Sequence, residues 1–91
     1  MAEIGRRSEP TEAERNDPLL AEVARAAAAF REARRIKEYP DKWERLNVRN
    51  AAIVKASRYG RTLRAIGRSA GMTHRGVRLV IEDYRAGIRY G

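Results

Sequence analysis

The stretch from Thr62 to Ile81 reads TLRAIGRSAGMTHRGVRLVI, and it decides the fold expected for the chain. The pattern predicts two short helices joined by a tight turn. Thr62 and Thr73 each precede an apolar-periodic run, and a threonine in that place can cap the free amides of a helix start. Gly71 lies between the two runs and can adopt the positive φ at which a helix commonly ends.

Each of these helices has one apolar face at helical spacing. In the first helix the face consists of Leu63, Ile66 and Ala70. In the second helix the positions i, i+3, i+4 and i+7 are Val77, Val80, Ile81 and Tyr84. Such faces are typical of helices that bury one side against a core. The remaining face of the second helix is therefore expected to lie in solvent, and it is largely basic.

The stretch resembles the helix-turn-helix of small bacterial and phage DNA-binding regulators. In that family a glycine ends the first helix, and the second helix reads DNA in the major groove. Counted outward from Gly71, the family's buried positions are all apolar here: Ile66, Ala70, Met72, Val77 and Val80. The chain departs from the family at Gly67, where alanine is more common. A glycine there costs the helix about 1 kcal/mol relative to alanine.

The resemblance implies roles for individual residues. The expected base-reading residues are Thr73, His74, Arg75, Arg78, Leu79 and Glu82. An arginine on this face can pair with two acceptors of a guanine, and a leucine can meet a thymine methyl group. The expected phosphate contacts are Arg58, Arg61, Thr62, Arg64 and Arg68. Phosphate contacts fix the register of a protein on DNA but carry no sequence information directly.

Charge is distributed unevenly along the 91 residues, whose net charge is +8. Residues 1–40 hold eight Lys/Arg and eight Asp/Glu, whereas residues 41–91 hold twelve and four. A folded domain does not need such an imbalance, because like charges repel in the compact state. A polyanionic partner such as nucleic acid accounts for it.

The first 39 residues divide into two segments. Residues 1–16 are charged and small, which predicts a disordered arm. Residues 17–39 predict one long helix, which begins with Asp17 as the cap and Pro18 at the first position. Its apolar stripe has the spacing of a coiled-coil or bundle helix and consists of Leu19, Val23, Ala26, Phe30 and Ala33. We expect this helix either to brace its own chain or to join two chains in a homodimer.

Residues 40–91 are expected to form the DNA-binding domain. Asp41 and Glu44 have the spacing of a capping box at the start of a helix that ends before Gly60. Trp43 and Leu46 are expected to anchor the core from this helix. The expected fold class is all-α, with a long N-terminal helix followed by a three-helix unit that contains the helix-turn-helix.

Several functional classes find no support in the sequence. The chain has no cysteine and a single histidine, so disulfides are excluded and a metal site lacks ligands. No glycine-rich phosphate loop and no nucleophile–histidine pair occur, and we expect neither catalysis nor a cofactor. No apolar run approaches the roughly 20 residues of a membrane span. The expected location is the cytoplasm, on a bacterial nucleoid or in a phage-infected host cell.

Three functions are compatible with a small basic helical protein. The favoured one is a sequence-specific regulator that binds double-stranded DNA as a dimer, because the basic face coincides with the helix that the fold presents to a groove. The alternative is a small interaction factor that docks on an acidic surface of a host polymerase or regulator. A non-specific DNA coater would share the charge but would not need the face around Arg75 and Arg78.

Overall fold

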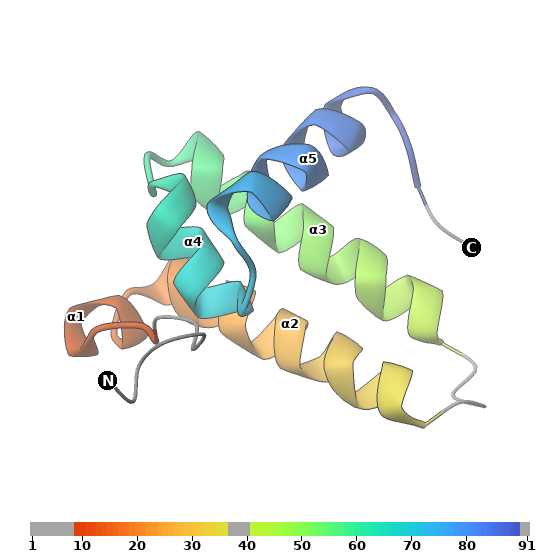
Figure 1. Ribbon diagram of the computed structural model, residues 1–91, viewed down its shortest axis with the longest axis horizontal. Helices are drawn as coiled ribbons and strands as arrows, with labels where there is room; N and C mark the ends of the chain where they lie inside the picture. The colour runs from red at the N-terminus through yellow and green to blue at the C-terminus, as the bar shows by residue number, and fades with distance from the viewer. Residues whose placement is uncertain (1–8, 37–40, 90–91) are drawn as a thin grey trace.

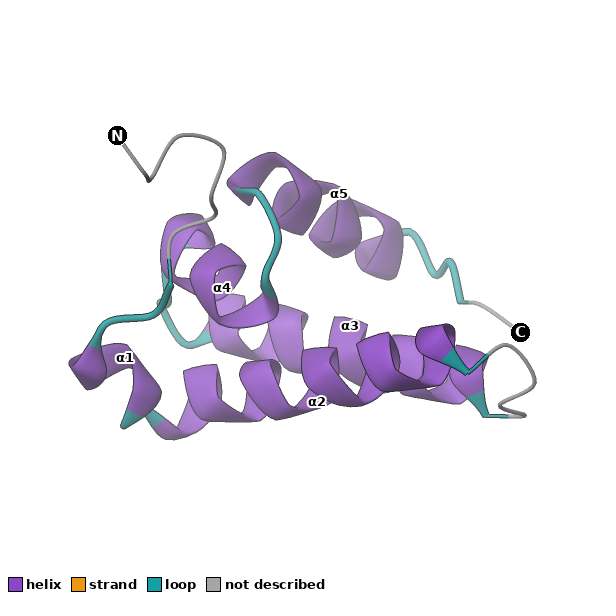
Figure 2. Cartoon of the chain, turned by 60° about the horizontal axis from the view of Figure 1, so that its bottom comes forward, coloured by secondary structure: helices purple, strands orange, loops and turns teal. Residues whose placement is uncertain are grey.

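The computed structural model describes residues 9–36 and 41–89, and every regular element in these ranges is a helix (Figure 1). In chain order the helices are α1 (Glu12–Arg15), α2 (Pro18–Arg35), α3 (Lys42–Arg58), α4 (Leu63–Ala70) and α5 (His74–Arg85). The long helices α2 and α3 run antiparallel to each other, and α4 and α5 lie together on top of them (Figure 2).

The boundaries of α4 and α5 follow the local capping chemistry. The hydroxyl of Thr62 accepts a hydrogen bond from the amide of Ala65 at 3.1 Å, and that of Thr73 accepts one from Gly76 at 3.0 Å. Gly71 follows α4 with a φ of +71°. The two caps and the glycine stop predicted from the sequence are confirmed.

The start of α2 is also as predicted. One carboxylate oxygen of Asp17 accepts hydrogen bonds from the amides of Leu19 and Leu20, at 2.9 and 3.1 Å. Pro18 occupies the first helical turn, where its missing N–H costs no hydrogen bond. The helix ends at Arg35, earlier than expected, and Ile36 has extended backbone angles. Residues 37–39, the end of the expected helix, lie outside the described residues.

The expectation of a disordered arm is wrong for the residues just before α2. Glu12–Arg15 form a helical turn that begins with a capping box. The amide of Glu14 donates to the hydroxyl of Thr11 at 3.1 Å, and the amide of Thr11 donates to the carboxylate of Glu14 at 3.0 Å. These reciprocal bonds satisfy two backbone donors that would otherwise need water. Residues 1–8 lie outside the described part of the chain.

The predicted capping box at the start of α3 is wrong. Asp41 makes no side-chain hydrogen bond to the amides of the helix. Its carboxylate instead accepts from Nε of Arg45 at 3.3 Å, one turn along the helix. The helix ends as expected at Arg58, shortly before Gly60, whose φ is +89°.

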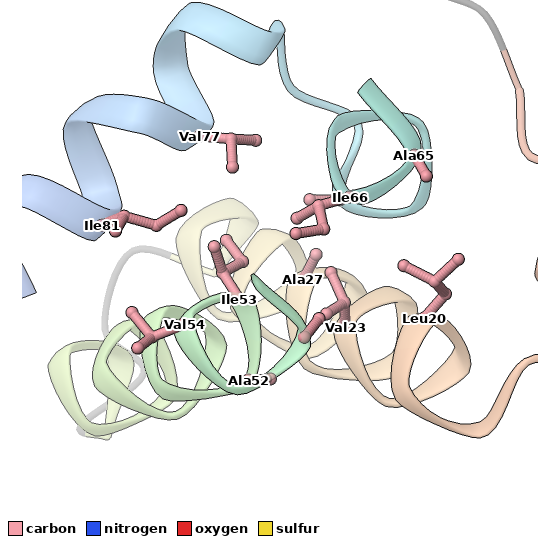
Figure 3. Close-up of a cluster of buried hydrophobic side chains, with 12 residues drawn as sticks. Leu20, Val23, Ala27, Ala52, Ile53, Val54, Ala65, Ile66, Val77 and Ile81 are labelled. Atoms are coloured by element: carbon pink, nitrogen blue, oxygen red, sulfur yellow. The ribbon is translucent and has the colours of Figure 1, made fainter. Parts of the chain in front are cut away.

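One hydrophobic core joins the four longer helices (Figure 3). Val23 of α2, Ile53 of α3, Ile66 of α4 and Val77 of α5 point toward one another and have no solvent exposure. Leu20 and Ala27 add to the core from α2. The expected boundary near residue 40 therefore does not separate two packing units, because α2 shares its core with the rest of the chain.

The apolar stripe of α2 is buried within its own chain. The buried residues are Leu20, Val23, Ala27, Phe30 and Ala33. Leu19 and Ala26, which were expected in the stripe, are only partly buried. The buried face is displaced because α2 packs against both α3 and α4. The stripe is thus covered by α3 and α4 of the same chain, which is the bracing role expected for this helix.

Trp43 does not anchor the core, contrary to the sequence-based expectation. Its side chain is 45% exposed, and Nζ of Lys42 lies 4.8 Å from the centre of its ring. Among the described helices, α4 and α5 lie over the later turns of α3, so neither covers the first turn (Figure 1). Leu46, one turn further, is the first core residue of α3.

Gly67 is required by the close approach of α4 to the following turn. Its carbonyl oxygen accepts the amide of Met72 at 2.8 Å, which closes the helix end. A Cβ atom added at Gly67 would lie 2.6 Å from the carbonyl oxygen of Met72. This contact with fixed backbone explains why position 67 is a glycine.

We expect Gly67→Ala to destabilise the protein by about 1–3 kcal/mol, although alanine is the better helix former. The loss arises because the added methyl group forces the turn away from α4. Urea unfolding followed by circular dichroism measures the change.

Gly76→Ala is the matched comparison. Its added Cβ would meet the hydroxyl of Thr73 at 3.3 Å and the flexible end of Met72 at 3.4 Å. We expect this variant to unfold closer to the starting protein. A Gly67→Ala variant as stable as the starting protein would contradict the packing described here.

Candidate nucleic-acid interface

The six residues that the sequence assigned to base reading lie on the exposed face of α5 and at its N-cap, Thr73. Val77 and Ile81 bury the inner face, so the other side of the helix remains in solvent. Each of the six is exposed: Thr73, His74, Arg75, Arg78, Leu79 and Glu82. Leu79 is 55% exposed and gives this polar face one apolar side chain.

The two arginines of this face are available for binding. Neither Arg75 nor Arg78 forms a hydrogen bond or an ion pair with any residue in the described ranges. They lie three positions apart on a helix, so their side chains project from neighbouring turns on one side. Each retains five N–H donors in a planar fork, the geometry that suits guanine edges and phosphates.

The residues assigned to phosphate contacts fall into two groups. Arg58, Thr62 and Arg64 are exposed near the start of α4. Arg58 and Arg64 form no ion pair with a described residue. The positive end of the α4 helix dipole lies in the same region and favours an anion. These three positions fit the expected contact with a DNA backbone.

Arg61 and Arg68 form the second group, and acidic residues of the N-terminal segment hold both. Arg61 donates from Nε to Asp17 at 3.0 Å, and its Nη2 lies 2.9 Å from the same carboxylate oxygen. Arg68 donates from Nε to Glu14 at 3.0 Å and from Nη2 to the other carboxylate oxygen. A phosphate contact by either arginine would require exchange of its carboxylate partner.

These ion pairs perturb the carboxyl groups. The hydrogen bond from Arg68, together with that from the Thr11 amide, lowers the pKa of Glu14 from 4.5 to about 2. The amide of Leu20 and then the guanidinium of Arg61 lower the pKa of Asp17. Both carboxylates therefore stay ionised at neutral pH.

The sequence could have predicted the short helix that carries Glu14, but not the arginine partners of Glu14 and Asp17. The capping-box spacing of Thr11 and Glu14 is visible locally, and it would have placed a helix there. The partners are 54 residues apart for Glu14 and Arg68, and 44 apart for Asp17 and Arg61. Only the packing of α1 and the start of α2 beside α4 brings them together.

The described residues offer little chemistry besides charge. They include no group of three or more His, Cys, Asp or Glu side chains that could hold a metal ion. A hollow of about 460 Å³ lies between α3 and α5, and it is lined by Ala51, Val54, Lys55, Arg58, Tyr59 and Tyr84. These side chains include no carboxylate and no imidazole. None of the described helices has the length and apolar character needed to cross a membrane.

Comparison of the chain with protein-family models, with curated proteins and with solved structures finds no match. A functional argument therefore depends on the surface itself. Its main features are the two available arginines on α5, the exposed basic residues at the start of α4, and the acidic residues that hold Arg61 and Arg68.

We expect Glu14→Gln to lower stability at neutral pH, because it removes the ionised partner of Arg68. The folded pKa of Glu14, about 2, lies below its ordinary value of 4.5. The stabilisation is thus complete above about pH 5 and is lost as the pH falls toward 2. The stability difference between the variant and the starting protein should shrink over that window in urea titrations.

Glu12→Gln provides the control, because Glu12 is exposed on the same helical turn and makes no ion pair within the described chain. It should leave the pH dependence unchanged. A Glu14→Gln variant whose stability difference stays constant from pH 7 to pH 3 would show that the pair contributes nothing.

Proposed function

We propose that the chain is a sequence-specific regulator that binds double-stranded DNA and reads the major groove with α5. The observation that carries the proposal is the pair Arg75 and Arg78, exposed and without a described partner on one side of a helix. The buried side of the same helix is fixed in the core by Val77 and Ile81. The proposal implies a cytoplasmic location, with bacterial or phage DNA as the target.

The dimensions of α5 suit this role. Its 12 residues correspond to a helix about 18 Å long, and a B-DNA major groove about 12 Å wide admits an α-helix. Arg75 and Arg78 would pair with guanine edges, Leu79 would contact a thymine methyl group, and Glu82 would accept from a cytosine amino group. His74 and Thr73 lie at the first turn, the part of a reading helix that enters a groove first.

The start of α4 would position the protein on the backbone. Arg58, Thr62 and Arg64 supply side chains and a helix start whose amide dipoles favour phosphate. Arg61 and Arg68 would join them only by leaving Asp17 and Glu14. The same basic surface would also fit an acidic protein surface, which is the alternative function that the sequence left open. A direct measurement of DNA binding distinguishes the two.

A salt titration on duplex DNA is the first test. Binding should weaken steeply with salt, with a slope of log K against log salt of about −4 or steeper, because several phosphates release condensed counterions. Selection of bound sequences from a random duplex pool would supply the preferred site. Absence of binding even at low salt would overturn the DNA proposal and favour an acidic protein partner.

Two substitutions separate positioning from reading. Arg64→Ala should weaken binding to the preferred site and to a scrambled duplex alike, and should make the salt slope shallower by about one unit. Arg78→Ala should cost about 1–3 kcal/mol on the preferred site and relax selectivity at one base pair. The binding constants of both variants on both duplexes show which arginine contacts the backbone and which reads a base. If Arg78→Ala weakens the two duplexes equally, α5 is not the reading helix.

A further inference from the structure

A hollow of about 320 Å³ opens between the middle of α2, α3 and the turn that follows α4. Three arginines line it: Arg31 and Arg34 from α2, and Arg49 from α3. Ala27, Phe30 and the segment from Ala70 to Thr73 complete its wall. We call this feature the arginine pocket.

Neutral groups hold the arginines in place. Nη1 of Arg31 donates to the carbonyl oxygen of Ala70, the last residue of α4, at 3.1 Å. The guanidinium carbons of Arg34 and Arg49 lie 5.7 and 5.2 Å from the centre of the Phe30 ring. Arg49 also donates from Nε and Nη2 to Oδ1 of Asn50, at 3.0 and 2.9 Å. A ring and a carbonyl orient a guanidinium without neutralising it, so Arg31 and Arg34 keep their positive charge.

The two α2 arginines of the pocket have no carboxylate partner within the described residues. No carboxylate is among the residues that line it, and neither Arg31 nor Arg34 forms an ion pair with a described residue. This differs from Arg61 and Arg68, which carboxylates hold on the other side of α4. Guanidinium groups gathered around one hollow repel each other, and an anion placed between them relieves the repulsion.

The position of the pocket links it to α5. Thr73 both lines the pocket and caps the first turn of α5. The pocket therefore opens directly beside the start of the proposed reading helix. The α4–α5 unit thus has two basic sites. The exposed arginines lie at the start of α4, and the arginine pocket lies at its end.

We propose that the arginine pocket binds a backbone phosphate of the DNA, with Arg31 and Arg34 as the contacting residues. The inference rests on the proposed function and adds α2 to the DNA interface. Guanidinium groups suit phosphate because their N–H donors match its oxygens in pairs.

The source of the phosphate follows from the shape of the surface. Both α2 arginines are exposed, so the pocket is open to a phosphate that belongs to a polymer. A second hollow, of about 310 Å³, lies beside it and is lined by Arg31, Arg34 and Arg35. Arg35 is already paired with Glu32, at 2.7 Å, so Arg31 and Arg34 are the side chains of this surface that remain for phosphate. Two such arginines one turn apart on a helix fit neighbouring phosphates of a polymer better than one free anion.

The test is the salt dependence of duplex binding by the full-length double variant Arg31→Gln/Arg34→Gln. Loss of two phosphate contacts should make the slope of log K against log salt shallower by about two units, on preferred and scrambled duplexes alike. Arg25→Gln is the matched control, because Arg25 is exposed on the same helix and does not line the pocket. It should keep the original slope.

The single variant Arg34→Gln is the control for loss of the fold, because it leaves the hydrogen bond from Arg31 to Ala70 intact. It should keep the urea unfolding midpoint and make the slope shallower by about one unit. Inorganic phosphate, titrated against the starting protein and followed by NMR, identifies a free-anion site. Saturable phosphate binding that disappears in the double variant, with an unchanged DNA slope, would overturn the inference.

The failures of the two proposals are distinguishable. If the starting protein binds no DNA at any salt concentration, the proposed function is wrong and this inference falls with it. If the starting protein binds with a steep slope and the double variant has the same slope as Arg25→Gln, only the role of the arginine pocket is wrong.

Discussion

Val23, Ile53, Ile66 and Val77 meet in a cluster without solvent exposure, and the orientation of α5 depends on this contact. The helix α4 has eight residues, too few for an isolated helix to be stable in water. It must therefore be held by packing, and Ile66 provides that packing between α2, α3 and α5 (Figure 3). The cluster thus fixes the angle between α4 and α5 and, with it, the direction in which Arg75 and Arg78 project.

Polar contacts from the N-terminal part of the chain secure α4 at several points. Asp17 holds Arg61 just before the helix, Glu14 holds Arg68 within it, and Arg31 donates to its last carbonyl oxygen. Burial of α2 and these polar bonds both stabilise the contact between residues 9–36 and the α4–α5 unit. The acidic residues also compensate part of the positive charge, because they pair with Arg61 and Arg68, whereas Arg75 and Arg78 on α5 form no ion pair with a described residue.

The features that the sequence predicted correctly are those determined within about one helical turn. Thr62, Gly71 and Thr73 act on neighbouring amides and carbonyls, so their spacing alone located α4, the turn and α5. The exposed face of α5 followed from the same periodicity. Asp41 shows the limit of local patterns, because its carboxylate turned to Arg45 instead of the helix amides.

The features that the sequence missed depend on tertiary packing. The exposure of Trp43 follows from where α4 and α5 lie over α3. The partners of Arg61 and Arg68 come from more than 40 residues away, and nothing in their own neighbourhood indicates them. Arg31 and Arg34 belong to a segment whose charges balance overall, so composition did not suggest an anion site there.

The central claim is that α2 completes the core that holds α4 and α5 as one binding unit. Chemical unfolding of residues 41–91 alone, followed by circular dichroism beside the full chain, tests it most directly. Without α2 the core loses Leu20, Val23 and Ala27, so the fragment should show low helicity and no cooperative transition. A cooperative transition in the fragment, with the helicity of the intact protein, would contradict the account.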